Sequence, residues 1–344
     1  MLTQVAGSRV YDFSHAVGRR DMGNPIGVAV GPGDLVYALS RQHEQIPGVA
    51  WNMTGVNAKV EMYTIGTVPG DEEDAGSFGG YGDGEGKLIW PAGIALDGNQ
   101  NVYVTDEWMN RVAVFDKGGE FQAFWGSAGS DKGEFNRPSG IVIDSGDKVY
   151  IVDSLNHRIQ KLSIDGTYVA EWGSPGAGPG QFNSPWGIEI DSGGNVYVAD
   201  HKNHRVQKFT GDGVYVAEFG SFGAGDGELT RPSDVAVDPE GDVYVCDWAN
   251  SRVQVFAPDG EFVISLIGDA QRLSKWHQQQ VDSNADVIKA RRRVRSLEPE
   301  WRLALPVGVE FDAAKSRLFI TDTQRSRLQI YNKLNDYIEP QFNL

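Results

Sequence analysis

The chain is poor in three features that would point to particular classes of protein. It has a single cysteine, Cys246, which excludes a disulfide framework within the chain. No apolar run approaches the ~20 residues that a membrane-spanning helix needs. Basic residues are scarce, with 31 Lys and Arg against 47 Asp and Glu and a net charge of −16, so we expect no nucleic-acid partner.

The first residues also lack a targeting signal. Residues 1–10 have neither the charged start nor the apolar stretch of a secretory signal peptide. With no membrane-spanning run, this predicts a soluble, cytoplasmic protein without a membrane partner. The lone Cys246 stands in a strand-sized run, where we expect a small buried thiol.

What the chain does contain is a repeat. Four prolines fall 47 residues apart, and each opens a variant of one pattern: Pro91, Pro138, Pro185 and Pro232. In residues 138–173, a Pro-x-Gly segment leads into four short strand-like runs, the last of which closes on Trp172 and Gly173. A fixed period of this length with four strands is typical of a propeller blade. One blade cannot bury both faces of its sheet, so the repeats must pack into a closed ring.

Two further copies open at Pro25 and Pro306, at longer distances from their neighbours. The surplus places insertions at residues 42–58 and 269–305. The sequence therefore predicts an all-β fold, a six-bladed β-propeller of four-stranded antiparallel blades with a helical insertion between blades 5 and 6. It forms one domain over residues 1–344. The blades start near residues 25, 91, 138, 185, 232 and 306.

Two segments compete to complete the last blade. Residues 10–17 form a strand-like run that ends at Gly18, as the fourth strands of other blades end in glycine. The tail at residues 337–342 is the alternative, and the sequence does not decide between them.

The repeated motif carries a resemblance. Residues 153–160 (DSLNHRIQ) and 200–207 (DHKNHRVQ) resemble the NHL repeat, which is named for an Asn-His-Leu triplet. The resemblance covers nearly the whole chain and implies a six-bladed ring. It leaves function open, because NHL-like propellers include ubiquitin ligases, receptor-kinase sensors and a peptide-amidating lyase, and related rings include lactone hydrolases. The zinc-binding histidines of the amidating lyase have no counterpart, since their slots hold Ile26, Ala92, Ser139, Trp186, Ser233 and Val307.

Most repeated residues are expected to be scaffold, because repeated positions serve stacking before function. An Asp and an Arg recur five residues apart in five blades: Asp106/Arg111, Asp153/Arg158, Asp200/Arg205, Asp247/Arg252 and Asp322/Arg327. His157 and His204 occupy equivalent positions. The aromatic residues that precede a glycine on the fourth strands are expected to pack between blades: Trp125, Trp172 and Phe219.

Function is better sought where one repeat differs from the others. Glu189 and Glu310 stand on inner strands where other blades have small apolar residues, and Asp234 replaces the glycine of Pro-x-Gly. Three acids near the axis predict a site for Ca²⁺ or Mg²⁺. Calcium is also what the resemblance to propeller lactonases and to the amidating lyase implies. The alternative is that each Glu pairs with an Arg or Lys between blades. No organic cofactor is indicated.

In each blade, one residue follows directly after the second strand, at the rim of the ring. This residue differs from blade to blade, as a specific pocket requires. Among these rim residues, Glu107 or His201 is a candidate general base, and Arg41 is a candidate for holding an oxyanion or carboxylate. Three tryptophans are candidates for an aromatic wall: Trp108, Trp186 and Trp248.

Both insertions join strands on the face that carries the pocket mouth, which predicts a lid. His43 and His277 lie in the two insertions and are candidates for completing the site. In the second insertion, Ser283 or Asn284 is the expected cap of a helix that runs through Arg295. The alternative is a plug that only stabilises ring closure.

These features favour a hydrolase or lyase that acts on a small molecule in an axial, lidded and metal-assisted pocket. The alternative is a non-catalytic propeller, a sensor or scaffold, that binds a ligand or a protein partner through its top face. RNA binding is disfavoured because phosphate recognition needs a basic face.

Overall fold

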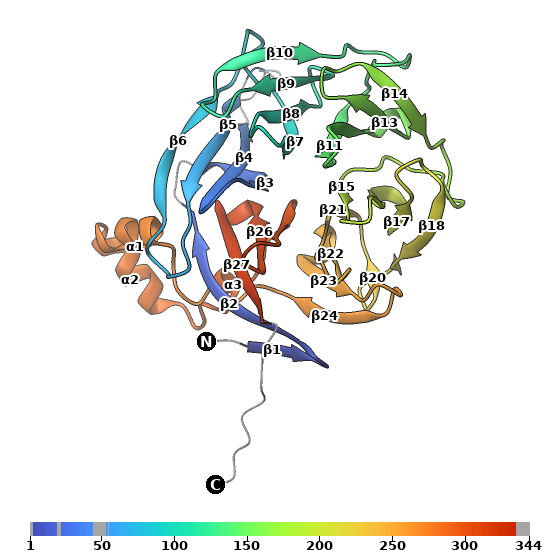
Figure 1. Cartoon of the computed structure of the whole chain (residues 1–344). Helices are drawn as coiled ribbons and strands as arrows, with labels where there is room; N and C mark the ends of the chain where they lie inside the picture. Colours follow the sequence, from blue (N-terminus) through green and yellow to red (C-terminus); the bar gives the residue numbers. More distant parts are fainter. Residues whose placement is uncertain (1–2, 19–21, 44–52, 54, 335–344) are drawn as a thin grey trace.

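In the computed structural model, six sheets stand around a central axis like the blades of a propeller (Figure 1). The structure describes residues 3–18, 22–43, 53 and 55–334. All neighbouring strands within a blade are antiparallel, and the inner strand of each blade lies nearest the axis. The predicted fold is therefore confirmed.

The first three blades contain strands β3 to β14. They span Asn24–Val30, Leu35–His43, Gly55–Thr64 and Glu73–Gly79 (β3–β6); Pro91–Leu96, Val102–Asp106, Arg111–Phe115 and Phe121–Trp125 (β7–β10); and Pro138–Ile143, Lys148–Asp153, Arg158–Ser163 and Tyr168–Trp172 (β11–β14).

The other three blades follow the same order. They contain Ile188–Ile190, Val196–Asp200, Arg205–Phe209 and Tyr215–Phe219 (β15–β18); Pro232–Val237, Val243–Asp247, Arg252–Phe256 and Phe262–Leu266 (β21–β24); and Val309–Asp312, Arg317–Asp322 and Arg327–Leu334 (β25–β27). A small parallel pair, Ser221–Phe222 (β19) and Glu228–Leu229 (β20), lies between blades 4 and 5.

The N-terminal strand closes the ring. Arg9–Val17 (β2) pairs antiparallel with β27 and becomes the fourth strand of blade 6, while Thr3–Ala6 (β1) adds a fifth. Of the two sequence alternatives, residues 10–17 are the closing strand, and residues 337–342 lie outside the described residues. The Arg9 guanidinium donates two hydrogen bonds of 2.7 Å to Asp242, which ties this strand to blade 5.

Close packing at the axis explains the glycine of the Pro-x-Gly motif. A Cβ atom added at Gly93 would lie 2.5 Å from the carbonyl oxygen of Ser139, and one at Gly140 would lie 2.6 Å from that of Trp186. At Gly93 and Gly140, the inner strand thus rests against the backbone of the next blade, and a side chain at either glycine would push the two blades apart.

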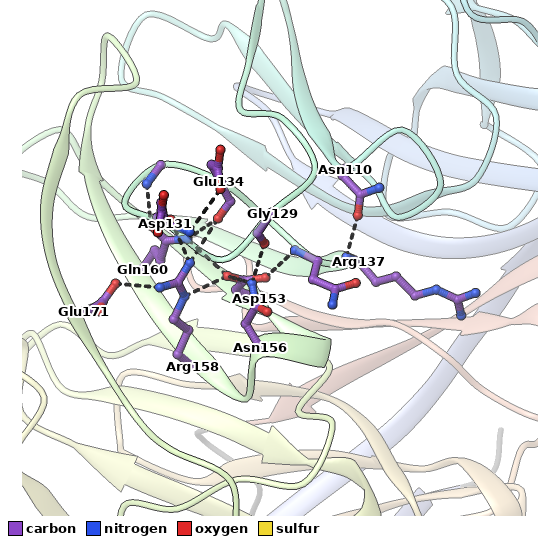
Figure 2. Close-up of polar contacts among 12 residues, drawn as sticks. Asn110, Gly129, Asp131, Glu134, Arg137, Asp153, Asn156, Arg158, Gln160 and Glu171 are labelled. Carbon is purple, nitrogen blue, oxygen red and sulfur yellow. Dashed lines mark hydrogen bonds and ion pairs between the residues drawn. The ribbon is translucent and has the colours of Figure 1, made fainter.

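The repeated Asp is a hub inside each blade, shown for blade 3 in Figure 2. One carboxylate oxygen of Asp153 accepts a hydrogen bond of 2.7 Å from the backbone N–H of Asn136. The other accepts hydrogen bonds from the side chains of Asn156, Arg158 and Gln160, at 2.8, 2.8 and 3.1 Å. The carboxylate is fully buried and fully used, as the scaffold interpretation predicts.

Four of the five predicted Asp/Arg pairs form ion pairs among the described residues: Asp153–Arg158, Asp200–Arg205, Asp247–Arg252 and Asp322–Arg327. In blade 2, the guanidinium carbon of Arg111 instead lies 3.5 Å from the ring centroid of Phe124. Phe124 stands at the position that Glu171 holds in blade 3, where Glu171 accepts a hydrogen bond of 2.9 Å from Arg158. In blade 2, the Phe124 ring therefore takes the place of a carboxylate partner for the arginine.

The histidines of the repeat are also structural. His157 and His204 have left-handed backbones, with φ of 55° and 59°. Their Nδ1 atoms each accept a 3.1 Å hydrogen bond from the backbone N–H before the next blade's proline, that of Ser184 or Arg231. Asn110 plays the same part for Arg137, so the position is a blade-to-blade link.

The fourth-strand aromatic residues pack between blades as predicted. The ring centroid of Trp172 lies 6.2 Å from that of Phe209 in blade 4, and the centroid of Phe219 lies 6.2 Å from that of Phe256 in blade 5. A Cβ atom at Gly166, in blade 3, would lie within 3 Å of the Trp125 ring.

The second insertion is helical, but it does not cover the mouth. Lys275–Asp282 (α1), Ala285–Arg293 (α2) and Glu298–Trp301 (α3) follow blade 5, and α1 and α2 lie at the outside of the ring (Figure 1). The ring centroid of Trp276 lies 5.7 Å from that of Tyr63 at the far end of β5. The predicted lid is therefore wrong for this insertion, because its apolar contact is with the side of blade 1.

Two smaller points complete the insertions. Asn284 is the N-cap of α2, which ends at Arg293 rather than Arg295. The ends of the first insertion lengthen the β4–β5 hairpin, with His43 paired to Gly55, and residues 44–52 and 54 lie outside the described residues. None of the described helices is both long and apolar enough to cross a membrane.

Candidate functional site

The inner strands of all six blades enclose an axial cavity of about 330 Å³. Its wall is made of the backbone and the mostly small side chains of β3, β7, β11, β15, β21 and β25. A concave space lined by several elements with convergent polar groups is typical of a small-molecule site. Five ionisable side chains line the cavity and define its chemistry: Arg41, Glu107, Glu189, Asp234 and Glu310.

Arg41 and Glu107 meet at the mouth, where the second strands of blades 1 and 2 end. Arg41 Nη1 donates a hydrogen bond of 2.8 Å to the carbonyl oxygen of Pro91, and its guanidinium carbon lies 4.2 Å from the Trp90 ring centroid. Burial raises the pKa of Glu107, and the charge of Arg41 opposes that rise. The pair sets a fixed cation beside a carboxyl group at the entrance.

The three acids on the inner strands face the same cavity from three consecutive blades. Burial raises the pKa of Glu189 to about 8, with a further contribution from Asp234, and raises that of Asp234 to about 7. Burial also raises the pKa of Glu310, and the charges of Glu189 and Asp234 add to this effect. Within the described part of the chain, no Lys or Arg contributes to these shifts, so the predicted alternative of inter-blade ion pairs is not realised for the two Glu residues.

The three acids differ in their depth in the cavity and in their hydrogen bonds. Glu189 and Glu310 occupy one level, while Asp234 stands two residues earlier on its strand, nearer the mouth. One oxygen of Asp234 accepts a hydrogen bond of 3.0 Å from the backbone N–H of Val309 in blade 6. Asp234 thus also joins two blades. The sequence feature that indicates this link is the position of Asp234 at the glycine of Pro-x-Gly, where the inner strands of neighbouring blades touch.

The three acids do not form a closed metal cage. Within residues 3–18, 22–43, 53 and 55–334, their oxygens are not gathered within 4.8 Å of one another. Water ligands would therefore have to complete any cation sphere at this place, as Mg²⁺ in particular prefers.

His201 lies behind the cavity wall rather than in it. Its ring centroid is 4.2 Å from that of Trp186, which does line the cavity, and 6.1 Å from that of Trp248. Its Nδ1 lies 3.1 Å from the carbonyl oxygen of Pro232, and burial lowers its pKa to about 4. A neutral imidazole held this way supports Trp186. The structure does not bring it together with Arg41 and Glu107.

The remaining predicted pocket residues need correction. Trp108 is 38% exposed on the rim, and neither it nor Trp248 is among the described residues that line the cavity. The Nδ1 atom of His277 lies 3.0 Å from Ser274 Oγ at the start of α1, away from the mouth, because the helix packs on blade 1. The His43 side chain lies outside the described residues.

Comparison with protein families agrees with this architecture. A model of the NHL repeat matches residues 182–209 and 229–256, and a model described as a 6-bladed beta-propeller matches residues 95–173. The chain is a six-bladed propeller with NHL repeats. None of the curated proteins matches this NHL propeller in sequence.

Solved structures share the fold at low sequence identity. A catalytically inactive virginiamycin B lyase from Staphylococcus aureus with quinupristin is 13% identical, with a TM-score of 0.55, over 94% of this chain and 99% of that one. An auxiliary nutrient binding protein from Bacteroides thetaiotaomicron is also 13% identical, with a TM-score of 0.58, over 96% of this chain and 74% of that one. A Bacteroides thetaiotaomicron protein of unknown function is 16% identical, with a TM-score of 0.58 and the same two coverages.

Proposed function

We propose that this NHL propeller is a lyase or hydrolase that acts on a small molecule in the axial cavity. The observation that carries the proposal is the set of acids without cationic partners, Glu189, Asp234 and Glu310, whose pKa values burial raises toward neutrality. Perturbed titratable groups that share one cavity are typical of catalytic sites. The likeness of the ring to virginiamycin B lyase is consistent with this class of reaction.

The acidic residues and the arginine of the cavity have different proposed roles. A carboxyl group with a pKa near 7 is able to take a proton from carbon or water and return it to a leaving group at neutral pH. We assign this role to Asp234 and Glu189, while burial and the charges of these two acids raise the pKa of Glu310. Arg41 at the mouth carries a fixed positive charge suited to a carbonyl or carboxylate oxygen of the substrate. The Pro91 carbonyl oxygen and the Trp90 ring hold this arginine in place.

The carboxylate set also fits a hydrated Ca²⁺ or Mg²⁺, held by Glu189, Asp234 and Glu310 with water. When bound, the ion would supply positive charge for a developing oxyanion. Added MgCl₂ or CaCl₂ should then raise the melting temperature of the wild type, and raise it less in Glu189→Gln.

The test is turnover of a panel of lactones and esters, quinupristin included, followed by mass spectrometry of the products. The wild type should convert at least one compound, Glu189→Gln should lose about 100-fold in kcat, and Arg41→Gln should raise KM about tenfold. Glu120→Gln removes an exposed carboxylate outside the cavity and serves as the matched control, with unchanged turnover.

The second candidate is ligand binding without chemistry, as in a sensor or scaffold. The specific observation in its favour is Asp234, whose hydrogen bond to Val309 gives it a structural use. Saturable binding of a panel compound by the wild type, with no product after long incubation, would establish this candidate and overturn the enzymatic one.

A further inference from the structure

A second cluster of ligating side chains lies away from the axial cavity, where blade 6 meets blade 1. His15 comes from the closing strand β2, and Asp71 and Glu72 come from the segment between β5 and β6. A ring nitrogen of His15 and a carboxylate oxygen of each acid all lie within 4.8 Å of one another. This is the one such group of three that the described residues form.

The histidine supplies the observation that points to a ligand. His15 is 6% exposed, and its Nδ1 lies 2.8 Å from the Oγ atom of Ser14. Its Nε2 is buried and has no hydrogen-bond partner among the described residues. A buried polar atom left without a partner costs about 1–3 kcal/mol, so the arrangement is unfavourable unless something occupies it.

Backbone groups hold the two acids in place. Glu72 is 1% exposed, and its two oxygens accept hydrogen bonds from the backbone N–H groups of Gly70 at 2.9 Å and Lys275 at 3.2 Å. Asp71 Oδ2 accepts one of 3.0 Å from the N–H of Val68. Each of these hydrogen bonds uses one lone pair of a carboxylate oxygen, so further lone pairs remain for a ligand.

Two cationic side chains lie near the cluster of His15, Asp71 and Glu72. Arg317 lies near His15 but is engaged by Asp312 and by the carbonyl oxygens of Ile65 and Gly66. The Lys275 ammonium group bonds to the Glu72 carbonyl oxygen and to Glu73. Both cations are therefore occupied, and the charge of Asp71 and Glu72 is left for a ligand.

We propose that His15, Asp71 and Glu72 bind a divalent transition metal ion of the Zn²⁺ class, with Nε2 of His15 as the nitrogen ligand. One imidazole and two carboxylates form a mixed set that suits zinc, whereas Ca²⁺ and Mg²⁺ prefer oxygen alone. Asp71 is exposed, so a water molecule has access to the fourth position. The ion would clip the closing strand to blade 1 and so stabilise the ring.

Because the ligands come together only in the folded ring, zinc binding should raise the melting temperature. Protein stripped with EDTA and dialysed is titrated with ZnCl₂ by calorimetry and melted with and without the ion. The wild type should bind about one zinc per chain at this site. His15→Gln and Asp71→Asn should each weaken binding at least tenfold and lose most of the shift.

Each variant is compared with its own metal-free melt, so a loss of intrinsic stability does not enter the result. Asp71→Asn changes an exposed side chain and guards against a folding defect at the buried His15. Glu189→Gln, in the axial cavity, should keep the zinc shift. An absent shift in the wild type, an equal shift in His15→Gln and Asp71→Asn, or a shift lost only in Glu189→Gln would overturn the proposal.

Discussion

Asp153 and Glu189 are carboxylates in the same ring with opposite surroundings. Asp153 lies within a blade, where an arginine, two side-chain amides and a backbone N–H saturate it. Glu189 lies at the axis, where one adjacent N–H is its hydrogen-bond donor and its charged neighbours are acids. The first arrangement fixes structure and the second leaves a group available for chemistry. The neighbours, rather than the residue type, decide between the two.

The largest expected effect comes from removing a carboxylate of the saturated kind, inside a blade. Asp322→Asn leaves the buried Arg327 without its carboxylate and should lower the free energy of unfolding by about 3 kcal/mol, because an uncompensated buried charge is costly. Asp106→Asn in blade 2 is the matched control. Its arginine is held by Phe124, so the loss should be about 1 kcal/mol. Urea denaturation measures both, and equal losses would contradict the role given to the ion pair.

The next effect concerns pH and the axial acids. The folded-state pKa of Glu189 lies above its unfolded value, so its favourable contribution is complete below about pH 4.5 and is lost as pH rises to about 8. Glu189→Gln should flatten the fall in stability between pH 5 and pH 8 by about 2 kcal/mol or more. Melting curves across this range provide the measurement. An unchanged slope in the variant would show that Glu189 is not the titrating group.

The smallest expected effect concerns the blade-to-blade links. His157→Ala removes the acceptor for the Ser184 N–H and places alanine in a left-handed conformation, which should cost about 1–2 kcal/mol. His157→Asn should be nearly neutral, because Asn110 does the same work in blade 2. Chemical denaturation distinguishes them. If asparagine were as harmful as alanine, the link would depend on the imidazole itself.

Much of the ring could be predicted from the sequence, because each copy of the repeat corresponds to one blade. The blade count and the scaffold role of His157 follow from spacing and equivalence alone, whereas the sequence left residues 10–17 and 337–342 as alternatives for the closing strand. The inward direction of Glu189 and Glu310 follows from their register with small residues in other blades. Even the exception at Arg111 had a signal, since Phe124 replaces the glutamate found at Glu171.

Other features depend on tertiary contacts, which produce no repeating pattern in the sequence. The insertion that contains Trp276 packs on the side of blade 1 because Tyr63 offers an apolar surface there. His201 turns behind Trp186 because the carbonyl of Pro232 holds its ring. The His15 cluster joins segments more than 50 residues apart, neither of which contains a recognisable metal motif.

The pairing of β2 with β27 also constrains how the protein is made. The strand at residues 9–17 leaves the ribosome long before its partner at residues 327–334. Until that partner is made, the early strand has an unpaired edge, and the growing arc of blades has two open flanks. Strand β27 therefore converts an aggregation-prone arc into a ring, and termination of translation before it would leave five complete blades with no closure.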